Sequence, residues 1–137
     1  MKIVVIDGQG GSIGKTIIEQ LKKNSFSDPI IAIGTNSIAT LAMLKAGADF
    51  AATGENPILV ACEDADILIG PMGILAANSL LGEITPAIAV AVGKSKAEKI
   101  LIPSNKCKIT VAGMHDLTLG EAINQAVQTV LNYKNEK

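Results

Sequence analysis

The sequence predicts an α/β domain, a three-layer, doubly wound, Rossmann-like sheet of parallel strands. The run of Ile and Val in Lys2–Ile6 and the apolar run Ile30–Ile33 are typical of parallel strands that helices cover on both faces. Apolar residues at helical spacing follow the first run, at Ile13, Ile17 and Leu21. Strands that alternate with helices pair in parallel through right-handed crossovers, which place helices on both faces of one sheet.

The same alternation runs along the whole chain, with glycine, proline or asparagine at most of the junctions. The predicted strands are Lys2–Ile6, Ile30–Ile33, Phe50–Ala52, Asp66–Ile69, Lys99–Ile102 and Ile109–Ala112. The predicted helices are Ser12–Lys23, Ile38–Leu44, Pro57–Cys62, Ile74–Leu81, Pro86–Lys96 and a last helix that contains Ile123, Val127, Val130 and Leu131. No linker or repeat divides these elements, so residues 1–137 are expected to form a single domain.

Local signals indicate where two of the helices begin. Thr85 is a good N-cap, and Pro86 suits the first position of the helix that follows it. Thr118 and Glu121 have the spacing of a capping box, which opens the last helix. The run Ile109–Ala112 follows the preceding strand too closely for a crossover, so we expect it as an antiparallel strand at an edge of the sheet.

Composition excludes several classes of function. The formal charge is −1, every cation is a lysine, and 2% of the residues are aromatic. A nucleic-acid-binding surface is therefore not expected, because it needs a cationic field and rings for stacking. No apolar run reaches the roughly 18 residues of a membrane span, so a cytoplasmic protein is expected. Cys62, Cys107 and His115 lack the spacing of a zinc site, so no metal is expected.

The hydrophobic content of the chain bears on its assembly. Hydrophobic residues make up 48% of the sequence and charged residues 18%. A domain of this size with so few charges is expected to expose an apolar face, which a second copy of the chain would cover. The sequence therefore predicts a homo-oligomer.

The segment Asp7–Thr16 has the strongest chemical content. It joins the first strand to the first helix and holds four glycines within seven residues. Backbone N–H groups without side chains, at the positive end of a helix, form a site for phosphate. Gly8, Gly11 and Gly14 fit G-x-x-G-x-x-G, which resembles the dinucleotide-binding loop of the extended short-chain dehydrogenases. The sequence predicts NAD or NADP, or another phosphate-bearing small molecule, at Asp7, Gly8, Gln9, Gly10, Gly11, Ser12, Ile13 and Gly14.

Further contacts are expected where the other strands end, since ligands of open α/β sheets bind at the carboxyl ends of the strands. The second strand ends without an acid for a ribose, and the chain has no arginine for a ribose phosphate. Asn36 is a candidate for the ribose and Thr35 or Ser37 for a phosphate, while Asn36 and Ser37 serve equally well as helix caps. Glu55 is a candidate base or ribose ligand. The expected contacts are Gly34, Thr35, Asn36, Ser37, Gly54, Glu55, Gly70 and Pro71.

Two other functions stay open. Gly14-Lys15-Thr16 is the ending of a P-loop of a Mg-dependent NTPase, but Gln9 stands where that motif needs glycine. The second, fourth and fifth strands also end without an Asp that would hold Mg²⁺. The third hypothesis is a non-catalytic ligand-sensing or assembly module. Asp7 is expected either to pair with Lys15 or to act in catalysis, and whether the protein is an enzyme stays open.

Several segments together carry a family resemblance. They are the glycine loop, Gly34–Thr40, Ala52–Asn56, Gly70–Gly73, Ala77–Ser79, Gly82–Pro86 and Ile100–Pro103. On these residues the chain resembles a family of short bacterial proteins classed only as a domain of unknown function. The resemblance covers nearly the whole chain and implies a Rossmann-like fold. It implies no activity and no functional residue, because none is established for that family.

Overall fold

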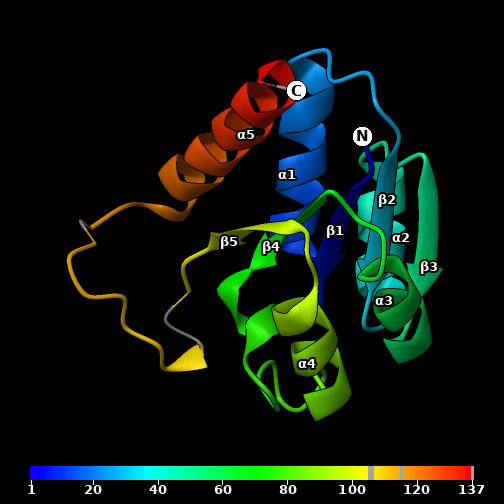
Figure 1. Ribbon diagram of the computed structural model, residues 1–137, viewed down its shortest axis with the longest axis vertical. Helices are drawn as coiled ribbons and strands as arrows, with labels where there is room; N and C mark the ends of the chain where they lie inside the picture. Colours follow the sequence, from blue (N-terminus) through cyan, green and yellow to red (C-terminus); the bar gives the residue numbers. More distant parts are fainter. Residues whose placement is uncertain (105–106, 115, 137) are drawn as a thin grey trace.

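The fold is a five-stranded parallel sheet with helices on both faces. A computed structural model describes residues 1–104, 107–114 and 116–136, so His115 lies outside the described residues. The strands are β1 (Ile3–Asp7), β2 (Ile30–Gly34), β3 (Phe50–Thr53), β4 (Ile67–Pro71) and β5 (Glu98–Ile102). The helices are α1 (Ser12–Lys23), α2 (Ser37–Lys45), α3 (Glu55–Ala61), α4 (Pro86–Lys94), α5 (Leu119–Asn135) and the short 3₁₀ helix η1 (Met72–Leu75). Figure 1 shows their arrangement, with the strands in the order β3-β2-β1-β4-β5.

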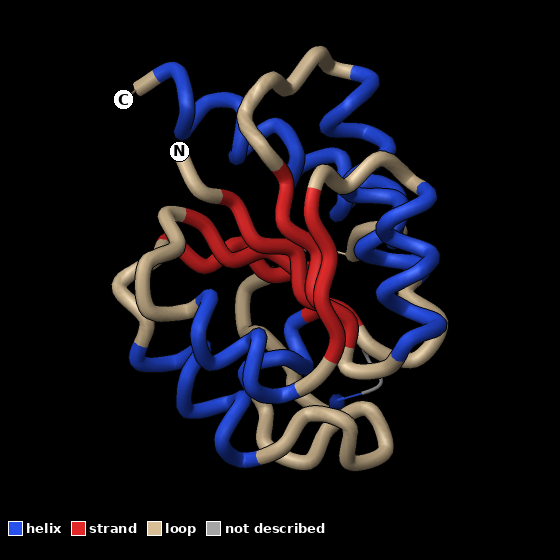
Figure 2. The backbone as a smooth tube through the Cα atoms, turned by 90° about the vertical axis from the view of Figure 1, so that its right-hand side faces the viewer, coloured by secondary structure: helices blue, strands red, loops and turns tan. Residues whose placement is uncertain are grey.

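Two apolar cores lie on opposite faces of the sheet. Side chains alternate along β1, so that Ile3 and Val5 pack with α1, α2 and α5, whereas Val4 and Ile6 pack with α3 and α4. Figure 2 shows helices on both sides of the strands. The predicted three-layer, doubly wound parallel sheet is confirmed, because its central strands are buried on both faces as their unbroken apolar sequences require.

The predicted helix starts are also confirmed. Thr85 Oγ1 accepts a hydrogen bond from the N–H of Ile88, and Pro86 is the first residue of α4. Thr118 Oγ1 accepts a hydrogen bond from the N–H of Glu121 at the start of α5. These caps satisfy N–H groups that have no partner inside the helix.

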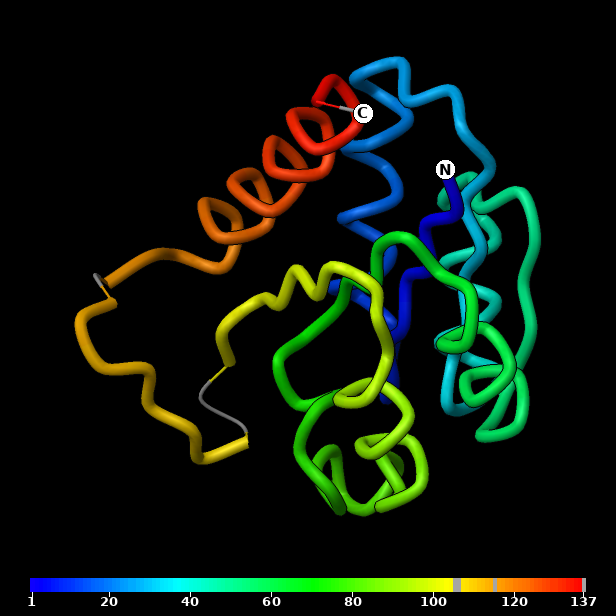
Figure 3. The backbone as a smooth tube through the Cα atoms, viewed as in Figure 1, coloured from blue at the N-terminus to red at the C-terminus, as the bar shows by residue number. Residues whose placement is uncertain are grey.

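The predicted sixth strand is wrong. None of the residues 109–112 belongs to a strand, and all four are exposed. Figure 3 shows that the described residues between β5 and α5, in particular 107–114, run outside the body of the domain. The Ile and Val of this segment favour a strand, but a strand needs a partner, and no described strand pairs with this segment.

The predicted helix Ile74–Leu81 is also wrong, because only η1 and a series of turns form there. Asn78, Leu80 and Leu81 have φ angles of 66°, 54° and 56°, which no right-handed helix contains. The N–H of Asn78 donates to the carbonyl of Ile84 at 2.6 Å instead of continuing a helix. Ile74, the first residue of the predicted helix, and Ile84, which follows these turns, both lie in the core.

Candidate functional site

The carboxyl ends of the strands meet at one edge of the sheet. The register pairs Asp7 of β1 with Gly34 of β2, and Gly34 with Thr53 of β3. Pro71 of β4 pairs with Ile102 of β5 at the same edge. The strand order reverses between β1 and β4, and ligands of such sheets bind at this reversal. The glycine loop lies beside it, since it leaves β1 and enters α1.

Asp7 fastens the two ends of the glycine loop to each other. Its side chain is 4% exposed. Oδ1 accepts a hydrogen bond from the N–H of Gly8, and Oδ2 accepts one from the N–H of Gly14, each at 2.7 Å. The N–H of Gly11 donates to the carbonyl of Gly8 at 2.9 Å and closes the turn between them. The loop therefore has a fixed shape that the protein provides by itself.

Burial raises the pKa of the Asp7 carboxyl above its ordinary value. The backbone hydrogen bonds from Gly14, Gly8 and Ile13 lower that pKa and offset only part of the effect. The nearby Glu83 raises it further. The predicted pair between Asp7 and Lys15 is wrong, because the described ion pairs do not include it and the Asp7 oxygens face backbone amides.

Lys15 instead lies on the outer side of α1. It lines a groove between α1 and α2 together with Leu41 and Lys45. Lys15 is exposed there, one turn of helix away from the loop that a P-loop lysine would serve. Within residues 1–104, 107–114 and 116–136, no three His, Cys, Asp or Glu side chains form a group that could hold a metal ion.

Glu83 reaches the glycine loop from the segment between η1 and α4. Its Oε1 accepts hydrogen bonds from the N–H of Gln9 at 2.9 Å, from Thr35 Oγ1 at 2.5 Å and from Asn36 Nδ2 at 2.8 Å. Partial burial favours the protonated form, but these three hydrogen bonds outweigh it and hold the pKa of Glu83 below its ordinary value. An anionic carboxylate of the chain itself therefore occupies the β2 side of the loop.

Glu83 is not among the site residues predicted from the sequence, although the three residues that donate hydrogen bonds to it are. Gln9, Thr35 and Asn36 lie 74, 48 and 47 positions away from it in the sequence. No local pattern marks a contact over such a separation. The only hint in the sequence is that the polar residues at the end of β2 have no charged partner close to them in the sequence.

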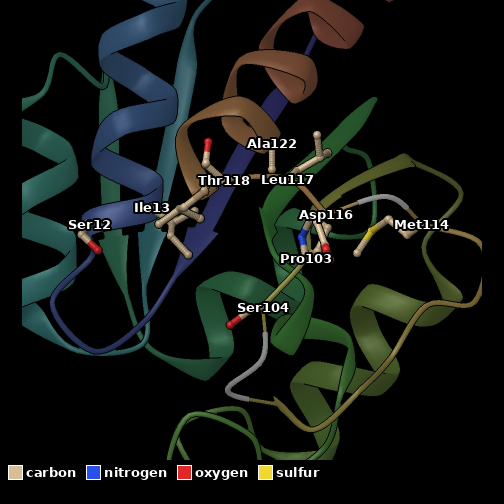
Figure 4. A pocket seen from close by; sticks show the side chains of 10 residues that line it. Ser12, Ile13, Pro103, Ser104, Met114, Asp116, Leu117, Thr118 and Ala122 are labelled. Carbon is tan, nitrogen blue, oxygen red and sulfur yellow. The ribbon is translucent and has the colours of Figure 1, made fainter.

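Two N–H groups of the loop have no acceptor among the described residues, namely those of Gly10 and Ser12. Gly10 is exposed, and a Cβ at this position would meet no atom within 4 Å. Ser12 and Ile13 line a cavity of about 440 Å³. Figure 4 shows the side chains around it, which come from α1, from the chain after β5 and from the start of α5.

The other predicted residues have varied roles. Asn36 caps α2, because its Oδ1 accepts the N–H of Ala39, and Ser37 is the exposed first residue of that helix. Glu55 accepts a hydrogen bond from Thr85 Oγ1 at 2.5 Å, which ties α3 to the cap of α4. The described hydrogen bonds and ion pairs join none of Ser37, Gly54, Glu55, Gly70 and Pro71 to the glycine loop.

Three of the predicted glycines allow close packing within the protein. A Cβ at Gly70 would overlap the carbonyl oxygen of Ile6 on the neighbouring strand. A Cβ at Gly34 would overlap Thr40 Oγ1. At Gly11, φ is +73° and a Cβ would lie 2.8 Å from Cα of Ala39, so this glycine lets the loop pack against α2.

Comparison with known proteins gives a family and a fold. The profile of a family described as domain of unknown function DUF3842 matches residues 2–135. The chain belongs to this family. No curated protein matches the chain. The crystal structure of a dodecameric FMN-dependent UbiX-like decarboxylase from Escherichia coli O157:H7 is similar, with a TM-score of 0.53 and 15% identity over 97% of this chain and 94% of that one.

This similarity extends over the whole domain and concerns the fold. In the described part of the chain, no helix has the length and apolar character needed to cross a membrane.

Proposed function

We propose that this protein binds a nucleotide whose phosphate lies at the N-terminus of α1. The observation that carries the proposal is the unpartnered N–H group of Ser12, a residue that lines a cavity of about 440 Å³; the N–H group of Gly10, two residues earlier, is also unpartnered. N–H groups at a helix N-terminus attract anions, and the cavity falls within the roughly 300–1,000 Å³ of small-molecule sites. Met114 and Leu117 offer apolar contact to a ring, and Ser104 and Thr118 are polar residues of the same wall.

The position of the cavity favours a mononucleotide over the NAD or NADP that the glycine spacing predicts. The cavity lies towards β5, where Pro103 and Ser104 line it. The β2 side of the loop, where a dinucleotide would place its second nucleoside, holds Glu83. FMN joins one phosphate to one ring system, and the structurally similar decarboxylase is FMN-dependent. FMN is therefore the first ligand to test, with NAD and NADP beside it.

The test compares two serines at equivalent positions of two helices. Ser12→Asp places a carboxylate beside the free N–H groups, where it repels a phosphate but favours the helix dipole and so preserves the fold. Ser37→Asp makes the same change at the first residue of α2 and is the matched control. We expect FMN to raise the melting temperature of the wild-type protein, and Ser12→Asp alone to weaken FMN binding about tenfold or more.

Two results would refute this proposal. One is that neither FMN, NAD nor NADP shifts the melting temperature at millimolar concentration. The other is that Ser12→Asp and Ser37→Asp weaken binding equally. If ATP binds only with Mg²⁺ and Lys15→Ala abolishes that binding, the NTPase reading replaces this one.

We also propose that the protein forms a homo-oligomer through the surface around β3. Large apolar side chains are exposed there on α2, β3 and α3: Ile38 is 71%, Leu41 49%, Leu44 45%, Phe50 62% and Val60 56% exposed. β3 is an edge strand that pairs with β2 alone, so this surface also has unpaired backbone groups. The similar decarboxylase is dodecameric, which supports self-association.

Light scattering during size-exclusion chromatography tests the homo-oligomer. We expect an oligomer for the wild-type protein and a monomer for Leu41→Lys. Val90→Lys on α4, where Val90 is 61% exposed, is the matched control and is expected to leave the oligomer intact. A wild-type monomer at all concentrations, or an oligomer that Leu41→Lys leaves unchanged, contradicts this interface.

A further inference from the structure

We propose that Glu83 and Leu80 form a plug, a part of the chain that fills the β2 side of the glycine loop and so determines which nucleotides the protein accepts. The proposal rests on the proposed function, because it concerns the specificity of the same loop. The plug excludes ligands that carry a second nucleoside on the β2 side, such as NAD and NADP. Mononucleotides on the β5 side are unaffected.

The first step in the argument is the set of groups that Glu83 occupies. Its Oε1 accepts hydrogen bonds from the backbone of Gln9, the hydroxyl of Thr35 and the amide of Asn36. These are the groups of the loop and of the β2 end that are free to bind a ribose or a phosphate in an open site of this kind. A ligand that enters here must replace a charged acceptor that already has three donors.

Leu80 fills the space next to these groups. A Cβ at Gly8 would lie 2.9 Å from Leu80 Cδ1 and 3.1 Å from Glu83 Oε1. Gly8 is the first glycine of the motif, and its bare backbone would otherwise allow a ligand to approach closely. In this protein the side chains of the plug make that close approach instead.

The backbone of the segment is bent so that both side chains point inward. Leu80 and Leu81 have φ angles of 54° and 56°, a region that residues with a Cβ seldom adopt, and Gly82 follows with 85°. Such conformations persist where surrounding contacts hold them. Leu81, next to Leu80, is 96% exposed, so its side chain does not hold the bend; backbone hydrogen bonds within residues 78–84 hold it, together with the contacts of Leu80 and Glu83.

The negative charge of Glu83 opposes the binding of dinucleotides, in addition to the volume that the plug fills. The hydrogen bonds to Glu83 stabilise its carboxylate, and the buried Asp7 lies close enough to interact with it electrostatically. A phosphate on the second ribose would meet this negative charge without an arginine to offset it, because the chain contains none. NADP is therefore excluded more strongly than NAD.

The experiment measures the affinities of FMN, NAD and NADP by calorimetry for four proteins. These are the wild type, Leu80→Ala/Glu83→Ala, Glu83→Gln and Leu81→Ala. The double variant removes the plug, Glu83→Gln removes its charge with little change in volume, and Leu81→Ala alters the exposed residue between them as the matched control. Urea unfolding of each variant establishes that it is folded.

We expect the wild type and Leu81→Ala to bind FMN but to bind NAD weakly. The double variant is expected to bind NAD with an affinity at least about tenfold higher than that of the wild type, because the three hydrogen-bond donors to Glu83 become free. Its affinity for FMN is expected to stay the same. Glu83→Gln is expected to improve the binding of NADP more than that of NAD.

Two outcomes overturn the plug. If NAD binds the wild type and loses affinity in Glu83→Gln, then Glu83 is a ribose ligand and not a plug. If the folded double variant gains no affinity for NAD, then Glu83 and Leu80 are not what excludes it. The wild-type measurements separate these results from the proposed function, because failure of FMN, NAD and NADP alike to bind the wild type refutes that function, while a gain of NAD binding in the double variant still supports the plug.

Discussion

Removal of the hydrogen bond between Thr35 and Glu83 should measurably weaken the fold. The bond is 2.5 Å long and joins a hydroxyl to an ionised carboxylate, and it links the end of β2 to the segment before α4. Hydrogen bonds to charged groups contribute about 1.5–3 kcal/mol. Because Glu83 is partly exposed to water, we place the contribution of this bond below that range, at about 1 kcal/mol.

A double-mutant cycle isolates this bond from the others that Glu83 makes. Thr35→Val keeps the shape of the side chain and removes the donor, and Glu83→Ala removes the acceptor. The sum of the two single losses should exceed the loss in the double variant by about 1 kcal/mol, measured by urea unfolding. In thermal unfolding, Thr35→Val alone should lower the melting temperature by about 4 °C. Single effects that add to within about 0.3 kcal/mol would refute the reasoning, because the side chains would then act independently.

The remaining predictions concern pH and three single positions. The pKa of Glu83 is lower in the folded state than in the unfolded state. The stability that its ionised form contributes is therefore present above about pH 4.3 and is lost as the pH falls through the lower, folded-state pKa. The difference in stability between the wild type and Glu83→Gln, measured by urea unfolding, should shrink towards about pH 3. Gly70→Ala should cost about 3 kcal/mol or more, because its Cβ would overlap the carbonyl of Ile6, which cannot move without breaking the sheet. Gly120→Ala should instead stabilise the protein by about 0.5–1 kcal/mol, since a Cβ meets no atom within 4 Å in the first turn of α5; a loss of stability there would contradict this account. Lys15→Ala should leave FMN affinity unchanged, because Lys15 faces the groove between α1 and α2.

The fold could be predicted where local pattern and burial agree. β1 is buried along its whole length, and its unbroken Ile and Val run says so directly. The prediction failed at Ile109–Ala112, where local preference for a strand met no partner strand. It failed again at Leu80 and Leu81, whose left-handed backbone belongs to turns that the hydrogen bond from the N–H of Asn78 to the carbonyl of Ile84 closes. In both cases the deciding interaction lies outside the segment.

The candidate site could likewise be predicted only in part. The glycine loop, Thr35 and Asn36 were expected to lie together, and the sheet register and hydrogen bonds place them together. The sequence does not indicate that Asp7 and Glu83 accept hydrogen bonds from the loop. An Asp or Glu residue looks the same in the sequence whether or not its carboxylate is hydrogen-bonded. A motif identifies the donors of a loop, but the geometry determines which of them are still available to a ligand.

Because Asp7 fixes the shape of the glycine loop, that shape does not depend on a ligand. A loop that depends on its ligand for order loses its shape whenever the ligand changes, so both must change together. Here the Asp7 carboxylate holds the turn from Gly8 to Gly14 through hydrogen bonds within the protein. Under the proposed function, substitutions around Gly10 and Ser12 can therefore change which ligand is bound without rebuilding the first turn of the domain.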